Sequence, residues 1–415
     1  MPLTQNKFLW FGSLIVFLVL PSTALLQEHV GWWGIAAHLL LVALVLVVVT
    51  VLWPGIHLFA AGRYRLLLGI LFLGLALIFF VVYPMETAGQ FSTGSDRDEA
   101  LNIAVRRLLD GQYPYYERTP LGGAITPLPG AILLALPFVL LGNSAYQNLF
   151  WLLVFLYATT RYLEDRASAL ILLYVALALS PAIQYEYISG GDVLSNAIYV
   201  TALGLLVIRA YAAGARAKHW QVVGSLLLGI GLASRPNFYL LLPLLFVLLW
   251  KQSGLKAALV GCGLAILASL AVILPFYLYD PAGFTPLTAG NKLAIFDRSL
   301  PYASTAVVAL SVVASVVAAV FLARASRANL EPLFYYGLAI VQLVPIVCAV
   351  ILATAIGGHV DFSFLHDRYG LMFLVPGLWA CWWCFYGPGV PDYELLAALA
   401  PAWVRRDDRR PPPGL

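Results

Sequence analysis

The chain has 415 residues, of which 62% are hydrophobic and only 11% are charged, and its mean hydropathy is +0.88. An average soluble protein is about 45–50% apolar and about 25% charged. Charges this sparse could not cover a soluble fold, so the composition excludes a disordered chain and a disulfide-stapled secreted module. The net charge of +4 is too small and dispersed to follow a phosphate backbone, so we expect no nucleic-acid partner.

Long apolar runs recur along the whole chain. A hydrocarbon core of about 30 Å requires about 20 apolar residues in a helix. The runs that approach this length are 8–26, 31–53, 66–84, 145–160, 167–188, 193–213, 257–279, 303–323, 333–356 and 369–386. Residues 220–250 form two shorter runs, separated at Ser234-Arg235-Pro236-Asn237. The sequence therefore predicts an all-α, polytopic membrane protein with about 12 transmembrane helices.

A shorter apolar run at 127–141 decides the topology of everything after it. It contains Pro129 and Pro137. If the run does not cross, most of the 24 basic residues fall on one side of the membrane, as the positive-inside rule requires. If it crosses, every later loop changes sides and the bias reverses. We therefore interpret 127–141 as a re-entrant or surface-lying helix.

This topology predicts one transmembrane domain over 1–386 and a cytoplasmic tail at 387–415. It places both termini in the cytoplasm of a multi-pass protein in the cell (plasma or inner) membrane, in contact with membrane lipids. One large external loop with interfacial helices then covers 85–141.

Within the large loop, apolar residues recur at helical spacing from Glu99 to Leu109, with Arg106 and Arg107 on the other side. This pattern predicts an amphipathic interfacial helix that ends at Gly111.

Three acidic residues, Asp96, Asp98 and Glu99, stand at the start of that helix. The helix dipole favours acids there, so capping alone is one interpretation. A single cap would suffice, however, and three acids exceed that need. The alternative is a functional role, as a general base acting on a hydroxyl or as part of a divalent-cation site. Apart from such a cation we expect no cofactor, and we predict no particular residue as a metal ligand.

Other polar groups could converge on the same place. Arg235 lies at a proline-containing break between two short spans, and charges at such breaks are functional candidates. Lys292 and Arg368 lie in later external loops, and cations there suit a phosphate. Glu186 and Asp192 flank a Ser-Gly-Gly turn and form an acidic rim for a polar acceptor.

Several of these stretches together resemble the GT-C superfamily of integral-membrane glycosyltransferases. The matching stretches are Asp96–Glu99, Ala104 with Leu108-Leu109-Asp110-Gly111-Gln112-Tyr113-Pro114-Tyr115, Thr126-Pro127-Leu128-Pro129, Ser234-Arg235-Pro236, and His366-Asp367-Arg368-Tyr369 before 371–376. Protein O-mannosyltransferases and mycobacterial phosphatidylinositol-mannoside mannosyltransferases belong to this superfamily.

The resemblance implies a GT-C-like fold and an enzyme that takes a sugar from a polyprenyl-phosphate donor. An acid of the first external loop then acts as the base, here Asp98 with Glu99, or Asp96, and spacing does not choose between them. Arg235, Lys292 or Arg368, with Tyr369, would hold the donor phosphate. Residues expected to bind a lipid or glycan acceptor are Tyr113, Tyr115, Glu186, Asp192 and His366.

In-line attack by the acceptor would invert the anomeric configuration. Two other functions suit a chain with this many spans. One is a multi-pass transporter or lipid flippase, although such proteins usually have two similar halves and charges near the midplane. The other is a transferase of the O-antigen ligase or polymerase type, in which the large external loop usually comes late in the chain.

Overall fold

The computed structural model describes residues 7–90, 96–366 and 369–386, except for the side chain of His366. The predicted tail at 387–415 lies outside these residues. Within the described ranges the protein is helical, without a named β-strand, and a single antiparallel bridge joins Arg118 to Ala124. The expected all-α class is therefore confirmed.

The α-helices in chain order are α1 (Lys7–Val19), α2 (Thr23–Val30), α3 (Trp32–Val51), α4 (Trp53–Gly62), α5 (Tyr64–Thr87), α6 (Glu99–Leu109), α7 (Pro129–Leu140), α8 (Gln147–Leu163), α9 (Arg166–Leu179), α10 (Pro181–Ile188), α11 (Val193–Ala212), α12 (Lys218–Leu232), α13 (Leu241–Ser253), α14 (Leu255–Tyr279), α15 (Ala303–Arg324), α16 (Leu330–Gly357), α17 (Ser363–His366) and α18 (Gly370–Tyr386). The 3₁₀ segments are η2 (Leu20–Ser22), η3 (Pro114–Tyr116), η4 (Ser144–Tyr146), η5 (Gly214–Ala217), η6 (Pro236–Leu240), η7 (Lys292–Arg298) and η8 (Arg327–Asn329).

Seven helical segments in the described ranges are long and apolar enough to cross a membrane, or up to nine if each of two bent pairs is one span. The bent pairs are α7 with η4 and α8, at 99°, and α9 with α10, at 84°. Twelve spans stay a prediction, because helices such as α12 (15 residues) and α13 (13 residues) are short for a bilayer. The chain is a polytopic helical membrane protein.

The bend between α9 and α10 divides a run that the sequence suggested was one span, 167–188. Pro181 occupies the first turn of α10, where its missing N–H costs nothing, and the Ser180 side chain accepts a hydrogen bond from the Ile183 amide. A cap followed by proline therefore starts a new helix even inside an apolar run. By contrast, the short 3₁₀ segment with Pro21 between α1 and α2 does not end the expected span 8–26, because Lys7–Val30 forms one membrane-length segment.

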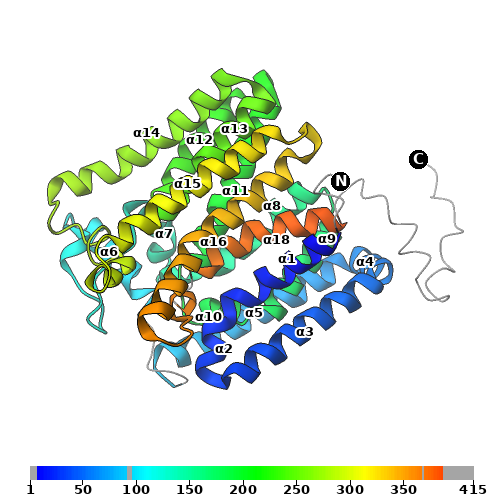
Figure 1. The fold of residues 1–415 in the computed structure, drawn as a ribbon, viewed down its shortest axis with the longest axis horizontal. Helices are drawn as coiled ribbons and strands as arrows, with labels where there is room; N and C mark the ends of the chain where they lie inside the picture. The colour runs from blue at the N-terminus through cyan, green and yellow to red at the C-terminus, as the bar shows by residue number, and fades with distance from the viewer. Residues whose placement is uncertain (1–6, 91–95, 367–368, 387–415) are drawn as a thin grey trace, which may run out of the picture.

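Helix α11 occupies the middle of the bundle (Figure 1), and 78% of its most apolar stretch is buried, against 17–50% for the other long spans. Helix α18 packs beside it, with two tryptophans that bond to neighbouring helices. Trp379 donates its indole N–H to Thr159 of α8 at 2.8 Å, and Trp382 donates to Ser168 of α9 at 2.9 Å. These bonds satisfy the only polar atom of each buried indole.

Helix α6 forms as predicted, and Gly111 ends it with a left-handed φ of +70°. Its buried residues Leu101, Ala104 and Val105 pack in one cluster with residues of α7 and with Phe284. The protein thus covers most of the apolar face of α6, while Leu109 at its end is 53% exposed. The positions of α6 and α7 relative to a bilayer stay predictions.

Candidate functional site

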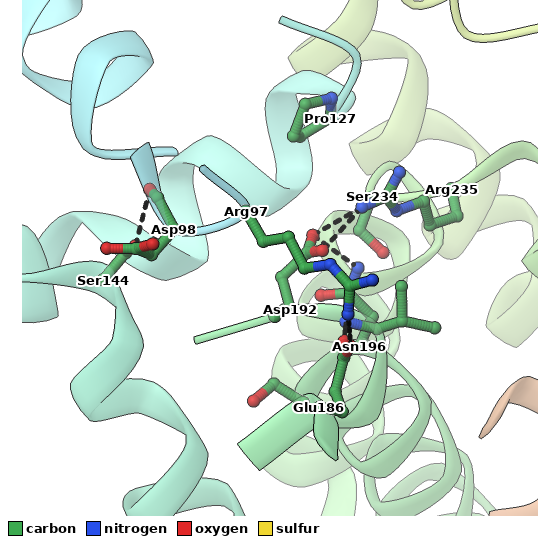
Figure 2. A network of polar contacts seen from close by, with 12 residues as sticks. Arg97, Asp98, Pro127, Ser144, Glu186, Asp192, Asn196, Ser234 and Arg235 are labelled. Atoms are coloured by element: carbon green, nitrogen blue, oxygen red, sulfur yellow. Dashed lines mark hydrogen bonds and ion pairs between the residues drawn. The ribbon is translucent and has the colours of Figure 1, made fainter. Parts of the chain in front are cut away.

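Asp98, immediately before α6, lies at the centre of a buried hydrogen-bond network. Its side chain is fully buried, and its Oδ2 atom accepts bonds from Tyr83 Oη at 2.5 Å, Asn143 Nδ2 at 3.2 Å and Asn102 Nδ2 at 3.3 Å. Asn143 also donates to Tyr83 Oη at 2.7 Å. The Ser144 hydroxyl donates to the Asp98 carbonyl at 3.1 Å (Figure 2). Three donors therefore hold one carboxylate oxygen.

The other oxygen of this carboxylate, Oδ1, is buried and has no hydrogen-bond partner among the described residues. Asp98 is the residue that precedes α6, yet within the same residues its side chain makes no capping hydrogen bond. Capping therefore does not account for it. Burial raises the pKa of Asp98, while the hydrogen bonds from Tyr83 and Asn143 act in the opposite direction.

A second carboxylate, Glu186, lies at the end of α10 and pairs with Arg97. Arg97 Nη1 lies 3.5 Å from Glu186 Oε2 and 3.2 Å from Ser189 Oγ, and its guanidinium stacks over the Tyr185 ring at 4.9 Å. The other oxygen, Oε1, accepts the backbone N–H of Val193 at 2.7 Å, at the start of α11. A carboxylate is favoured at this helix N-terminus.

A third carboxylate, Asp192, forms a buried ion pair with Arg235. Arg235 Nη2 lies 2.7 Å from both oxygens of Asp192, and Asn196 Nδ2 donates to Oδ2 at 3.1 Å (Figure 2). The two charged side chains are only 12% and 3% exposed. The break between α12 and α13 predicted from Pro236 is therefore confirmed, and it carries Arg235 to the N-terminus of α11.

The Ser-Gly-Gly turn brings the three carboxylates together. Gly190 has a φ of +71°, and a Cβ atom there would lie 3.1 Å from the Asp98 Cβ. A Cβ atom on Gly191 would lie 2.2 Å from the Glu186 carboxylate. Only glycines permit this close approach. Asp98, Glu186 and Asp192 thus gather around one turn, with Arg97 extending between them (Figure 2).

Beyond Arg235 the structure has a cavity of about 270 Å³. Three of the residues predicted to bind a phosphate line it: Arg235, Lys292 and Tyr369. Much of the remaining lining is apolar, for example Ile346 of α16. The Nε atom of Arg235 is buried without a hydrogen-bond partner among the described residues. Arg368, the fourth predicted residue, lies outside those residues.

The other predicted site residues make no hydrogen bond or ion pair with this carboxylate group among the described residues, although Asp96 and Glu99 are close to Asp98 in the chain. Asp96 is half-buried, and a Cβ atom on Gly123 would lie 3.8 Å from its Oδ2 atom. Glu99 is half-buried as the first residue of α6. His366 is the last residue of α17, and its side chain lies outside the description.

The two tyrosines predicted to bind an acceptor have buried rings and occupied hydroxyls. Tyr113 Oη donates to the carbonyl of Phe276 at 2.9 Å, and Tyr115 Oη donates to that of Pro127 at 3.1 Å. Both rings belong to the cluster beneath α6 and α7. Tyr113 thus fastens the 85–141 loop to α14, while Tyr115 makes its bond within that loop. Their role in acceptor binding stays a prediction.

Sequence reasoning did not identify the residues that hold Asp98, namely Tyr83, Asn102 and Asn143. Asn102 follows Asp98 by four residues, so the helical spacing alone could have paired them. Tyr83 ends an apolar run and Asn143 follows another, and only the fold brings them to the same carboxylate.

No group of three or more His, Cys, Asp or Glu side chains in the described ranges is placed to hold a metal ion.

Comparisons with protein families, with curated proteins and with solved structures give no match to this chain. The fold and the site define a polytopic helical membrane protein with a buried cluster of carboxylates and arginines beside a partly basic cavity.

Proposed function

We propose that the protein is a membrane glycosyltransferase of the GT-C type, which moves a sugar from a polyprenyl-phosphate donor to an extracytoplasmic lipid or glycan acceptor with inversion. The observation that carries the proposal is the Asp98 carboxylate. A buried acceptor atom without a donor costs about 1–3 kcal/mol, and Asp98 Oδ1 is such an atom in the described chain. An acceptor hydroxyl would supply the missing donor.

Asp98 is a stronger candidate for the base than Asp96. Three donors hold its Oδ2 atom, which fixes the direction of Oδ1. A preoriented carboxylate with a raised pKa suits proton abstraction near neutral pH. Asp96 is half-exposed and has no comparable set of donors in the described part of the chain.

The cavity beside Arg235 supports a lipid-phosphate donor. Arg235 and Lys292 supply positive charge, and Tyr369 supplies a hydroxyl donor. The apolar remainder of the lining suits the prenyl chain next to the phosphate. Arg235 is linked to the base through Asp192 and the glycine turn, so one rigid assembly orients both groups.

In the proposed reaction, the acceptor oxygen attacks the anomeric carbon while its proton passes to Asp98 Oδ1. The bond from the anomeric carbon to the phosphate oxygen breaks, and polyprenyl phosphate leaves with that electron pair. Arg235 and Lys292 stabilise the charge that grows on the leaving phosphate. The proton on Asp98 then returns to solvent.

The distribution of charge supports the sidedness of this proposal. With 127–141 not crossing and about 12 spans in total, most basic residues lie in the cytoplasm. Asp98, Glu186 and Asp192 then lie at the extracytoplasmic face of the cell membrane. A donor carried by lipid suits that face, where nucleotide sugars are scarce.

The test is transfer from radiolabelled polyprenyl-phosphate sugars in proteoliposomes that also contain the cell's envelope lipids and glycans. We expect Asp98→Asn to lower the transfer rate by about 10²–10⁴-fold, the usual contribution of a general base. Asp110→Asn, at an exposed acid of the same loop, is the matched control and should retain the wild-type rate. A folded Asp98→Asn protein with unchanged transfer would contradict the proposal.

A further inference from the structure

The candidate active site lies at the N-terminal end of α11. At the C-terminal end of this helix are two adjoining cavities that have no part in the proposed transfer. The first, of about 680 Å³, lies between α8 and α11 and is lined mainly by apolar side chains such as Val154, Ala202 and Leu206. The second, of about 340 Å³, is formed at the ends of α8, α11 and α13 and at the start of α16. Glu164 and Arg209 line both cavities, so the two adjoin each other at these side chains.

This pair of cavities lies far from the carboxylate cluster. Asp192 precedes α11 and Arg209 is near its end. At 1.5 Å per residue, 17 residues of helix separate them by about 26 Å. A ligand here would therefore not contact the candidate active site directly.

The side chains that line the two cavities carry more positive than negative charge. Arg161, Arg209 and Arg327 line the cavities together with Glu164 and Glu331. In the described ranges, Arg209 is the only one of the three arginines in an ion pair, with Glu331 at 3.1 Å. Arg161 and Arg327 are exposed and make no ion pair or hydrogen bond within the described residues. These three arginines and two glutamates have a net charge of +1. A ligand with one negative charge would neutralise it.

Buried polar atoms without partners also line these cavities. In the second cavity they are the Tyr162 hydroxyl, on a side chain that is 1% exposed, and Gln252 Oε1. In the first cavity the atom is Trp151 Nε1. Each lacks a hydrogen-bond partner among the described residues, which is costly unless a ligand or water supplies one.

We infer that the two cavities form one binding site for an anionic phospholipid whose headgroup carries hydroxyl groups. An acyl chain lies in the apolar cavity between α8 and α11. The phosphate lies between Arg161, Arg209 and Arg327, and the headgroup hydroxyls donate to Glu164 or to Gln252. This site is separate from the proposed donor site and does not depend on the transfer reaction.

Native mass spectrometry of the full chain in detergent tests this inference, with phosphatidylglycerol as the probe. Diacylglycerol with the same chains lacks the phosphate, and glycerol phosphate lacks the chains. We expect one phosphatidylglycerol to bind, and both partial probes to bind at least tenfold more weakly. The Arg161→Gln/Arg327→Gln variant should lower the affinity for phosphatidylglycerol by about tenfold or more, since it removes two of the three cations that attract the lipid phosphate.

Two further variants distinguish lipid binding at this site from general electrostatic attraction between the lipid and the protein. Arg216→Gln/Arg324→Gln removes two exposed arginines that line neither cavity, and should leave binding unchanged. Ala202→Trp fills the apolar cavity without changing charge, and should also weaken binding. Equal affinity of the Arg161→Gln/Arg327→Gln variant and the wild type would overturn the inference. An equal loss in both double variants, or equal binding of diacylglycerol, would overturn it too.

Discussion

The two ends of α11 each carry an ion pair, and the two pairs lie in different environments. At the start, Asp192 and Arg235 are 3% and 12% exposed, and the carboxylate also binds Asn196. At the other end, Arg209 and Glu331 are 44% and 19% exposed. The first pair joins the turn after α10 to the break after α12. The second lies at the rim of two open cavities.

This difference separates a rigid end of the molecule from an accessible one. A buried pair that loses one partner leaves an uncompensated charge, whereas solvent partly screens a pair that it reaches, such as Arg209 with Glu331. Proposed catalysis at the buried end needs fixed groups, and lipid binding at the other needs groups that a ligand can reach. Four predictions test the contrast.

The largest effect is expected from breaking the pairs themselves. Arg235→Ala should destabilise the protein by about 3–5 kcal/mol because Asp192 stays buried and charged. Arg209→Ala should cost less, about 1 kcal/mol, because Arg209 is exposed and solvent screens part of the charge left on Glu331. Thermal unfolding of both variants in the same detergent measures the difference. Equal losses would show that the two ends do not differ as described.

A smaller loss is expected from adding a methyl group at the buried end. A Cβ atom on Gly130 of α7 would lie 2.2 Å from the Ile230 carbonyl oxygen and 2.6 Å from that of Ala233. These are backbone atoms, so Gly130→Ala should cost about 1–3 kcal/mol through overpacking. Gly69→Ala, where a Cβ atom meets nothing within 4 Å, is the matched control in the same unfolding assay. An unchanged melting temperature for Gly130→Ala would mean that α7 and α12 are not packed so closely.

Lys292 tests the cavity beside the buried pair. Lys292→Gln should raise the KM for the polyprenyl-phosphate donor about tenfold, equivalent to about 1.4 kcal/mol, by removing one cation from the phosphate. Arg298→Gln removes an exposed charge from the same 3₁₀ segment but outside the cavity, and should leave KM unchanged. If both variants raise KM equally, the effect is general electrostatics.

The pH dependence of transfer tests the hydrogen bonds around Asp98. The base acts when it is ionised, so the rate should fall as the pH drops through the raised pKa of Asp98. The bond from Tyr83 lowers that pKa, so Tyr83→Phe should move the acidic limb of the rate profile to higher pH. The same substitution should leave the limb in place if Asp96, which Tyr83 does not contact, is the base.

Part of this arrangement follows from local sequence. The spacing of Leu101, Ala104 and Val105 predicted α6, and Pro236 predicted the break that positions Arg235. Both are local effects, of helical periodicity and of a ring that cannot continue a helix. The charges of Arg235 and Lys292 and the resemblance at Tyr369 predicted a phosphate site, and the structure places all three residues at one cavity.

The remainder depends on contacts between segments far apart in the chain. Asn143 lies 45 residues from Asp98, and Asp192 lies 43 residues from Arg235. No periodicity connects such residues, and only the packing of α5, α8, α11 and α12 brings them together. The burial that distinguishes Asp98 from Asp96 is likewise a property of the fold.

The most direct test of the proposed function is a cryo-EM map of the Asp98→Asn protein with a polyprenyl-phosphate sugar at saturating concentration. The substitution should trap the donor before transfer. The account predicts phosphate density in contact with Arg235 and Lys292, with the sugar directed toward residue 98. Donor density elsewhere in the protein, or an empty cavity at saturation, would contradict it.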